Sequence, residues 1–140
     1  TGAIKWFFKV KDRYESYFDK KTGQPYKFIR DVYEGGYTKN RIIEFDYTKN
    51  QANINDLKEK NKTTVPIRSN IQDIISAYYY LRNNYETASI KVGEVVQLDM
   101  FFDSEIFGFK LKYLGRETIK TKFGNVNCLK FRPYVMAGIY

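Results

Sequence analysis

The stretch Ser69 to Asn84, SNIQDIISAYYYLRNN, decides the fold class, because it is the clearest helical pattern in a chain of short alternating segments. Ser69 followed three residues later by Gln72 matches a capping box and predicts the first turn of a helix. The apolar side chains recur at helical spacing, at Ile71, Ile74, Ile75, Tyr78 and Leu81. Ser76 and Tyr80 fall outside this stripe. We therefore predict a helix whose stripe packs on an apolar surface.

Arg82 is the residue of this predicted helix that bears most directly on function. By the same count it lies near the middle of the apolar stripe, and a guanidinium there must pair with a carboxylate, reach solvent or line a cavity. In one interpretation Tyr78 and Leu81 fill the open side of a curved sheet, and Arg82 pairs with a strand carboxylate such as Asp99. In the other, the helix lines a cavity whose few polar groups are Arg82 and tyrosine hydroxyls.

The rest of the chain alternates with period two and is punctuated by turn residues, which predicts strands. Gly35-Gly36, between Glu34 and Tyr37, suits a two-residue hairpin, and Gly124-Asn125 is predicted to join the last two strands. Pro66 indicates a strand end or an edge strand. The predicted strands cover residues 6–19, 26–34, 37–47, 52–58, 63–67, 95–102, 106–114, 116–123 and 126–132.

The fold predicted from these elements is mainly β with one helix. Short connections between consecutive strands are typical of an antiparallel meander. We expect a strongly curved meander, a half-barrel or an open lipocalin-like barrel, with the helix over residues 71–84 packed against its concave face. At 140 residues the chain fits a single β-rich domain spanning residues 1–140, and we expect flanking strands of the full-length protein to be missing from it.

Composition narrows the classes of partner. The net charge of +8 permits attraction to anionic partners, but the lysines are spread over nearly every turn and strand, as on a solvated surface. The single cysteine, Cys128, allows no disulfide within the chain, and we expect it to be buried in a strand. No apolar run approaches the roughly 18 residues of a membrane span, so no transmembrane segment is predicted.

The chemistry available to the chain is limited because it contains no histidine. The usual general base, the commonest zinc ligand and the Ser-His and Cys-His nucleophile pairs are therefore excluded, and we predict no enzyme activity, no catalytic residues, no metal site and no cofactor. The acidic pairs Asp12 with Glu15, Glu44 with Asp46 and Asp99 with Asp103 leave a carboxylate-dependent hydrolase as a weaker alternative.

Aromatic side chains supply the candidate ligand-binding residues. Interleaved aromatic and basic residues are also found in nucleic-acid-binding platforms, but no motif of those modules is present, so nucleic acid is not the favoured partner. The favoured partner is a lipid or another amphipathic small molecule. The candidate ligand-binding residues are Tyr78, Tyr79 and Arg82 of the helix and Trp6, Tyr14 and Phe18 of the first strand.

Four segments, WFFKVKDRYESYFD, FIRDVYEGGY, DIISAYYYLRN and YLGRETIKTKFGNVNCLKFRP, together resemble an exported bacterial family known as domain of unknown function 3108, abundant in Bacteroidetes. The resemblance implies a periplasmic or outer-membrane-associated location, a signal peptide ahead of the present sequence, and a sheet similar to lipoprotein-carrier half-barrels. It implies no activity. We therefore expect lipid or amphiphile binding in the cell envelope, with a structural or assembly module that pairs with another envelope protein as the alternative.

Overall fold

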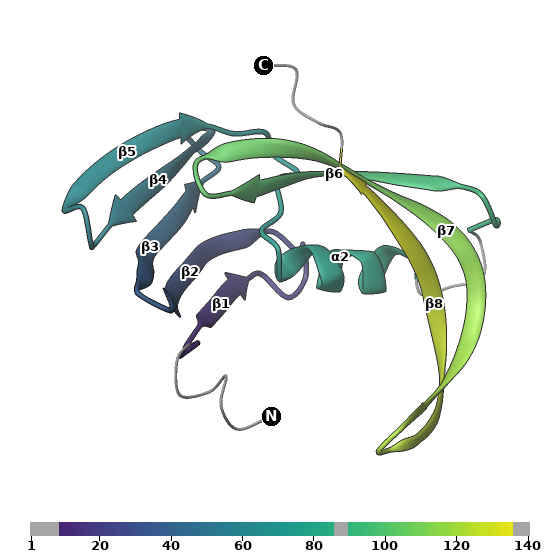
Figure 1. The fold of residues 1–140 in the computed structure, drawn as a ribbon. Helices are drawn as coiled ribbons and strands as arrows, with labels where there is room; N and C mark the ends of the chain where they lie inside the picture. The colour runs from purple at the N-terminus through teal and green to yellow at the C-terminus, as the bar shows by residue number, and fades with distance from the viewer. Residues whose placement is uncertain (1–8, 86–89, 136–140) are drawn as a thin grey trace.

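The computed structural model describes residues 9–85 and 90–135, which form two antiparallel sheets and a helix (Figure 1). The first sheet contains β1 (Arg13–Phe18), β2 (Pro25–Glu34), β3 (Tyr37–Asp46), β4 (Gln51–Asp56) and β5 (Asn61–Pro66), in that order. After helix α2 (Ser76–Tyr85), the second sheet contains β6 (Val95–Phe102), β7 (Glu105–Thr121) and β8 (Gly124–Val135). The predicted class, a mainly β antiparallel meander, is confirmed, and the two sheets do not close into a barrel.

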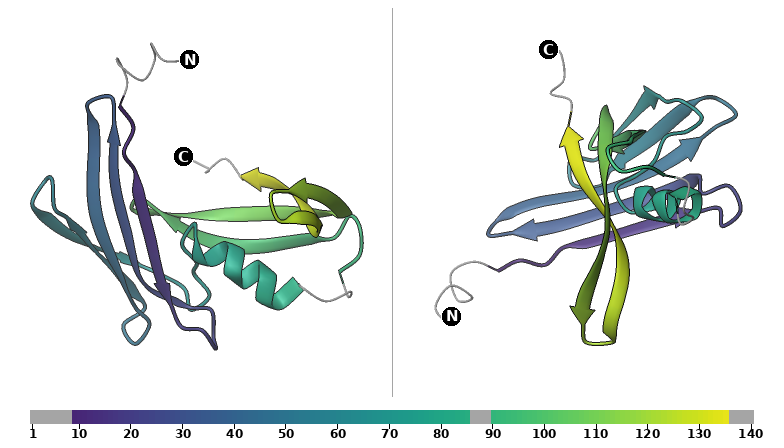
Figure 2. Two further views of the ribbon diagram at one scale, coloured as in Figure 1. Left: turned by 90° about the horizontal axis from the view of Figure 1, so that it is seen from below. Right: turned by 90° about the vertical axis from the view of Figure 1, so that its right-hand side faces the viewer.

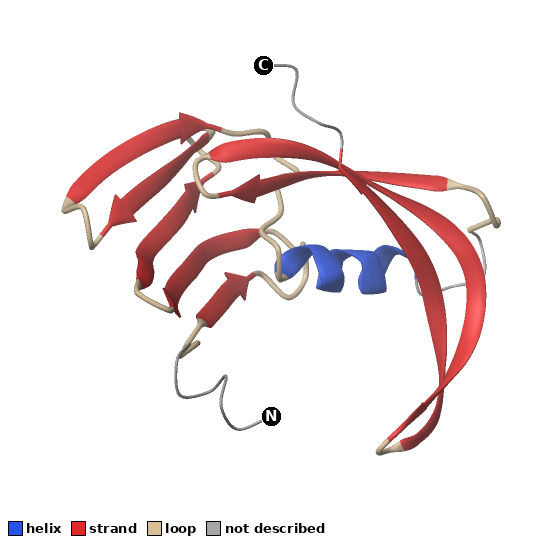
Figure 3. Cartoon of the chain, viewed as in Figure 1, coloured by secondary structure: helices blue, strands red, loops and turns tan. Residues whose placement is uncertain are grey.

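Helix α2 lies under the second sheet, as the views from two sides show (Figures 1 and 2). It starts near the first sheet and runs toward the bend of β7 and β8, with the strands arching over it (Figure 3). The helix thus occupies the concave side of the half-barrel, where the sequence pattern placed it.

The first sheet follows the predicted strands closely. Glu34 pairs with Tyr37, and Gly35 and Gly36 adopt φ angles of 53° and 98°, which confirms the two-residue hairpin. Pro66 is the last residue of β5, which is an edge strand of its sheet, as its position predicted. The first strand was predicted to start too early: β1 begins at Arg13, and of the described residues before it only Val10 forms an isolated bridge, with Glu34. Residues 6–8 of that prediction lie outside the described part of the chain.

The second sheet corrects two predictions. Residues 106–114 and 116–123 were expected to be separate strands, but β7 runs unbroken from Glu105 to Thr121. A β-bulge between Tyr113 and Gly115, where Gly115 adopts a φ of 109°, lets the strand bend without ending. Because Thr121 pairs with Gly124, the turn to β8 consists of residues 122 and 123 and not of Gly124-Asn125.

The start of the helix was also predicted wrongly. The backbone N–H of Gln72 donates to the carbonyl of Asp99 at 2.9 Å, and the N–H of Phe101 donates to the carbonyl of Gln72 at 2.8 Å. The segment before α2 is therefore extended and pairs with β6, so Ser69 and Gln72 form no capping box. The helix begins at Ser76, five residues after the predicted start at Ile71.

Asp73 caps the helix in place of Ser69. Its Oδ1 accepts the backbone N–H groups of Ile75 and Ser76, both at 2.8 Å, and its own N–H donates to Ser76 Oγ at 2.9 Å. The hydroxyl of Ser16 in β1 donates to Asp73 Oδ2 at 2.6 Å. The cap therefore joins the helix to the first sheet and sets which face of the helix is buried.

The burial of helix residues differs from the predicted stripe. Ser76 and Ala77 are buried and Tyr80 packs on the second sheet, although Ser76 and Tyr80 were placed outside the stripe. Ile74 and Tyr78 were expected in the core but are 36% and 71% exposed. The predicted stripe therefore exists only in part as a core surface, and the capping residues Asp73 and Ser76 are buried in its place.

Two apolar cores support the groove that α2 forms with the sheet. The first lies on the five-stranded sheet and takes in Phe101 of β6, whose ring packs edge-on against Phe45 with the ring centroids 5.6 Å apart. It contains Phe28, Ile43, Phe45, Ala52, Ile54, Ile67, Ile71 and Phe101. The second lies between α2 and the second sheet and contains Ala77, Val96, Leu98 and Leu111.

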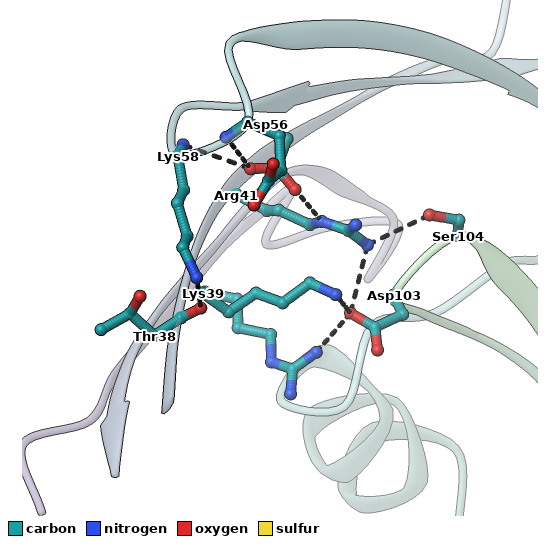
Figure 4. Close-up of polar contacts among 9 residues, drawn as sticks. Thr38, Lys39, Arg41, Asp56, Lys58, Asp103 and Ser104 are labelled. Carbon is teal, nitrogen blue, oxygen red and sulfur yellow. Dashed lines mark hydrogen bonds and ion pairs between the residues drawn. The ribbon is translucent and has the colours of Figure 1, made fainter. Parts of the chain in front are cut away.

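A charged cluster fastens the turn between β6 and β7 to the first sheet (Figure 4). Asp103 Oδ1 accepts from Arg30 Nη1 and from Arg41 Nη1, the latter at 3.3 Å, and Lys39 Nζ lies 3.6 Å away. Arg41 Nε also donates to Asp56 Oδ2 at 2.7 Å. Because Arg30 is nearly buried, Asp103 neutralises a charge that water reaches poorly.

Candidate functional site

A groove of about 770 Å³ lies between α2 and the concave face of the second sheet, and we call it the α2 groove. Its apolar lining residues are Ile74, Ala77, Leu81, Met100, Phe109, Leu111, Leu129, Phe131 and Pro133. Its other lining residues are Tyr78, Arg82, Arg116, Asn127 and Cys128. A largely apolar cavity of this size with a few polar groups is typical of small-molecule sites, which span roughly 300–1,000 Å³.

The sheet wall of the groove follows from strand alternation. Phe109 and Leu111 of β7 share one face, and Leu129 and Phe131 of β8 share the same face of the sheet. The bulge before Gly115 adds one residue, so that Arg116 lies opposite Leu129 and joins this face. Without the bulge, alternation from Phe109 and Leu111 would place Arg116 on the convex side.

The helix wall of the groove consists of Ile74, just before α2, and of Ala77, Tyr78, Leu81 and Arg82 of α2. Ile74, Tyr78 and Arg82 follow one another at spacings of four residues, about one helical turn, and Leu81 lies beside Arg82; all four line the groove. Ile74, Tyr78 and Leu81 of the predicted stripe therefore line the groove, whereas Ile71 and Ile75 pack on the first core. Arg82 is exposed, and Asp99, its predicted partner, pairs with Arg68 at 3.2 Å.

Of the six predicted ligand-binding residues, the structure brings Tyr78 and Arg82 together in the α2 groove. Tyr79 lies on another side of the helix and packs against Phe18 of β1, with the ring centroids 4.9 Å apart. Tyr14 packs near Phe28 of β2, 6.3 Å between centroids. Trp6 lies outside the described residues. The described members of the predicted set therefore lie in three places: the groove, the contact of α2 with β1, and the first sheet itself.

Sequence patterns missed several groove residues. Arg116, Asn127 and Phe131 were assigned to ordinary amphipathic strands, because their common face depends on the β7–β8 register and on the bulge. The glycine at position 115 was the one available signal, since an isolated glycine within a strand pattern often marks a bulge. Cys128 lies in a strand as expected, but it is only half-buried.

Comparison with protein families adds one finding to this geometry. A family model described as "Protein of unknown function (DUF3108)" matches residues 1–139. The chain belongs to the DUF3108 family. The family resemblance expected from the four sequence segments is thereby confirmed. Comparisons of this DUF3108 chain with curated proteins and with solved structures found no match.

Three of the carboxylates of this DUF3108 chain that suggested hydrolysis, Asp46, Asp99 and Asp103, are engaged in a turn or in ion pairs. Asp46 accepts the backbone N–H groups of the following turn, and hydrogen bonds from Thr48 and Lys49 lower its pKa, while Glu44 beside it is exposed. Asp99 and Asp103 have different arginine partners. Across residues 9–85 and 90–135, no group of Cys, Asp and Glu side chains is arranged to hold a metal ion.

No helix within the described ranges is long and apolar enough to cross a membrane.

Proposed function

We propose that this DUF3108 protein binds a lipid or another amphipathic small molecule in the α2 groove and catalyses no reaction on it. The observation that supports the proposal is the groove itself, about 770 Å³ in volume and lined mainly by apolar side chains. Tyr78 and Ile74 line it and are substantially exposed to solvent. A bound apolar chain gains about 25 cal/mol for each Å² of apolar surface removed from water.

The proposed location is the cell envelope of the producing bacterium, after export. The support is the resemblance of the quoted segments to an exported family. Fractionation of native cells, with the protein followed by antibody, is expected to recover it with the envelope or periplasm. Recovery with cytoplasmic markers would remove this part of the proposal and would leave the groove open to a cytoplasmic ligand.

The alternative, an assembly module that pairs through a strand edge, has less support. β5 is an outer strand of the first sheet, but it carries Lys62 and ends at Pro66. An edge lysine and a proline are features that discourage pairing with another strand. The hydrolase alternative also has less support, because Asp46 serves in a turn and Asp99 and Asp103 form separate ion pairs.

A neutral fluorescent probe that brightens in apolar sites, N-phenyl-1-naphthylamine, tests the proposal with a matched pair of variants. Leu129→Asp places a carboxylate on the groove face, whereas Val126→Asp places one on the convex face of the same strand. We expect the wild type and Val126→Asp to bind the probe, and Leu129→Asp to bind it about tenfold more weakly or worse. Equal binding by both variants, with circular dichroism unchanged, would contradict the proposal.

A further inference from the structure

The arginine and amide side chains of the α2 groove are gathered at one end. Met100 and Phe109 lie near the β6–β7 turn, at the end of the groove that adjoins the first sheet. Arg116 lies seven residues beyond Phe109 along β7, a span of about 23 Å at roughly 3.3 Å per residue. Arg82 lies in the last turn of α2, which runs toward the same outer end (Figure 1). The groove is therefore amphipathic along its length.

The polar groups at the outer end are hydrogen-bond donors. Arg82 and Arg116 face the groove from opposite walls, and a guanidinium offers five N–H donors and no acceptor. Asn127 lines the groove beside Arg116, diagonally across the β7–β8 ladder. Its Oδ1 already accepts the hydroxyl of Thr118 at 3.3 Å, which leaves its amide N–H groups to donate.

The charged side chains among the described lining of the α2 groove are both positive, Arg82 and Arg116. None of the described residues that line the groove is Asp or Glu. Carboxylate and phosphate oxygens match the planar fork of a guanidinium and form short charge-assisted hydrogen bonds with it. Arg82 and Arg116 are both exposed, so an anionic headgroup can reach them directly from solvent.

We infer that the ligand of the α2 groove is an anionic amphiphile, with its carboxylate or phosphate headgroup bound between Arg82 and Arg116 and its apolar chain directed toward Met100. This inference rests on the proposed function and specifies its ligand. Asn127 donates a further hydrogen bond to the headgroup. The bulge at Gly115 has a defined part in this arrangement, because it turns Arg116 onto the groove face.

Four amphiphiles with a sixteen-carbon chain and different headgroups distinguish the contribution of the headgroup to binding from that of the chain. They are hexadecanoic acid, hexadecyl phosphate, hexadecanol and hexadecyltrimethylammonium, each used below its aggregation concentration. Displacement of N-phenyl-1-naphthylamine from the wild type is expected to require about tenfold less acid or phosphate than alcohol, and more of the cation. A preference between acid and phosphate identifies the headgroup, and either preference supports the inference.

The variant arm uses Arg82→Gln with Arg116→Gln, and Arg132→Gln as the matched control. Arg132 is exposed and lies between Phe131 and Pro133, so strand alternation places it opposite the groove face. We expect the double variant to bind the anions only as well as the alcohol and to retain its affinity for hexadecanol. Arg132→Gln is expected to keep the anion preference of the wild type.

Two results would overturn the inference while leaving the proposed function intact. One is that hexadecanol displaces the probe as well as the anions do. The other is that Arg132→Gln loses as much anion binding as the double variant, which would assign the effect to general surface charge. If the wild type binds neither the probe nor any of the four amphiphiles, the proposed function fails together with the inference.

Discussion

At the scale of single residues, Asp73 couples the helix to the first sheet. The carboxyl group is fully buried, and burial raises its pKa although hydrogen bonds from Ser16 and Ser76 favour the charged form. A folded-state pKa above the unfolded one means that the folded chain binds this proton more tightly. The stability that Asp73 contributes is therefore greatest below the unfolded pKa and is lost as pH rises through the folded pKa.

Asp73→Asn tests this linkage. Asparagine also caps helices well, so the variant is expected to fold and to retain the Oδ1 hydrogen bonds. Urea unfolding of both proteins from about pH 3 to about pH 7 should show that the wild type loses stability relative to Asp73→Asn as pH rises. The difference between the two proteins is the quantity to follow, because hydrogen bonds lower the pKa of Asp19, Asp46 and Asp56 and give the opposite slope. A difference that grows in favour of the wild type with pH would contradict the burial argument.

Asp103 is the residue that joins the β6–β7 turn to the first sheet. It adopts a φ of 59°, which asparagine also tolerates, so Asp103→Asn removes the charge without new backbone strain. The side chain of Arg30, 11% exposed, then loses its counter-ion, and we expect the free energy of unfolding to fall by about 1–3 kcal/mol. This value is below that for a fully buried pair because Asp103 itself is 37% exposed.

Asp99→Asn provides the control for this prediction. Its partner Arg68 is 78% exposed, so the loss of the ion pair is expected to cost no more than about 1 kcal/mol. Denaturant unfolding measures both variants. If Asp99→Asn proves as costly as Asp103→Asn, the cluster around Asp103 does not fasten the two sheets together.

At the scale of elements, strand alternation and turn residues predicted most of the first sheet. The Gly35-Gly36 hairpin needed no tertiary information, because its positive φ angles suit glycine. The start of α2 was not predictable in the same way. The sequence pattern indicated a cap at Ser69, but tertiary contacts favour a cap at Asp73: Gln72 pairs with β6, and Asp73 binds Ser16. Local sequence contains neither contact.

The bulge in β7 gives a prediction for that element. Gly115 adopts a φ of 109°, and a Cβ there would meet Val92 Cγ2 at an ordinary 3.7 Å, so backbone strain alone opposes a side chain. Gly115→Ala is expected to lower the free energy of unfolding by about 1–3 kcal/mol, or to shift the register and turn Arg116 away from the groove. Thermal unfolding and the anion preference of the groove together measure both effects.

Gly108→Ala, in the same strand, is the matched control. Gly108 has no positive φ, and a Cβ there meets nothing within 4 Å, so we expect little change or a gain of a few tenths of a kcal/mol. If both alanine variants behave alike, the backbone conformation at Gly115 is not what holds the bulge.

At the scale of the whole molecule, the open half-barrel determines how far sequence could locate the site. Tyr78 and Arg82 were found because helical periodicity gathers them without reference to the sheet. Arg116 and Asn127 were missed because their position needs the β7–β8 register, the bulge and the placement of α2 beneath the sheet. Because the two sheets do not close into a barrel, part of α2 is left uncovered. Apolar residues of the helix can therefore line a groove.

Methionine-methyl NMR tests the central claim, that an amphiphile occupies the α2 groove with its chain toward the first sheet, most directly. The chain has two methionines, Met100 in the groove and Met136, and Met100→Leu assigns their signals. A long-chain fatty acid with a nitroxide at its tail end should broaden the Met100 methyl signal strongly, and one with the nitroxide beside the headgroup should broaden it less. An unchanged Met100 signal at saturating fatty acid would contradict the account.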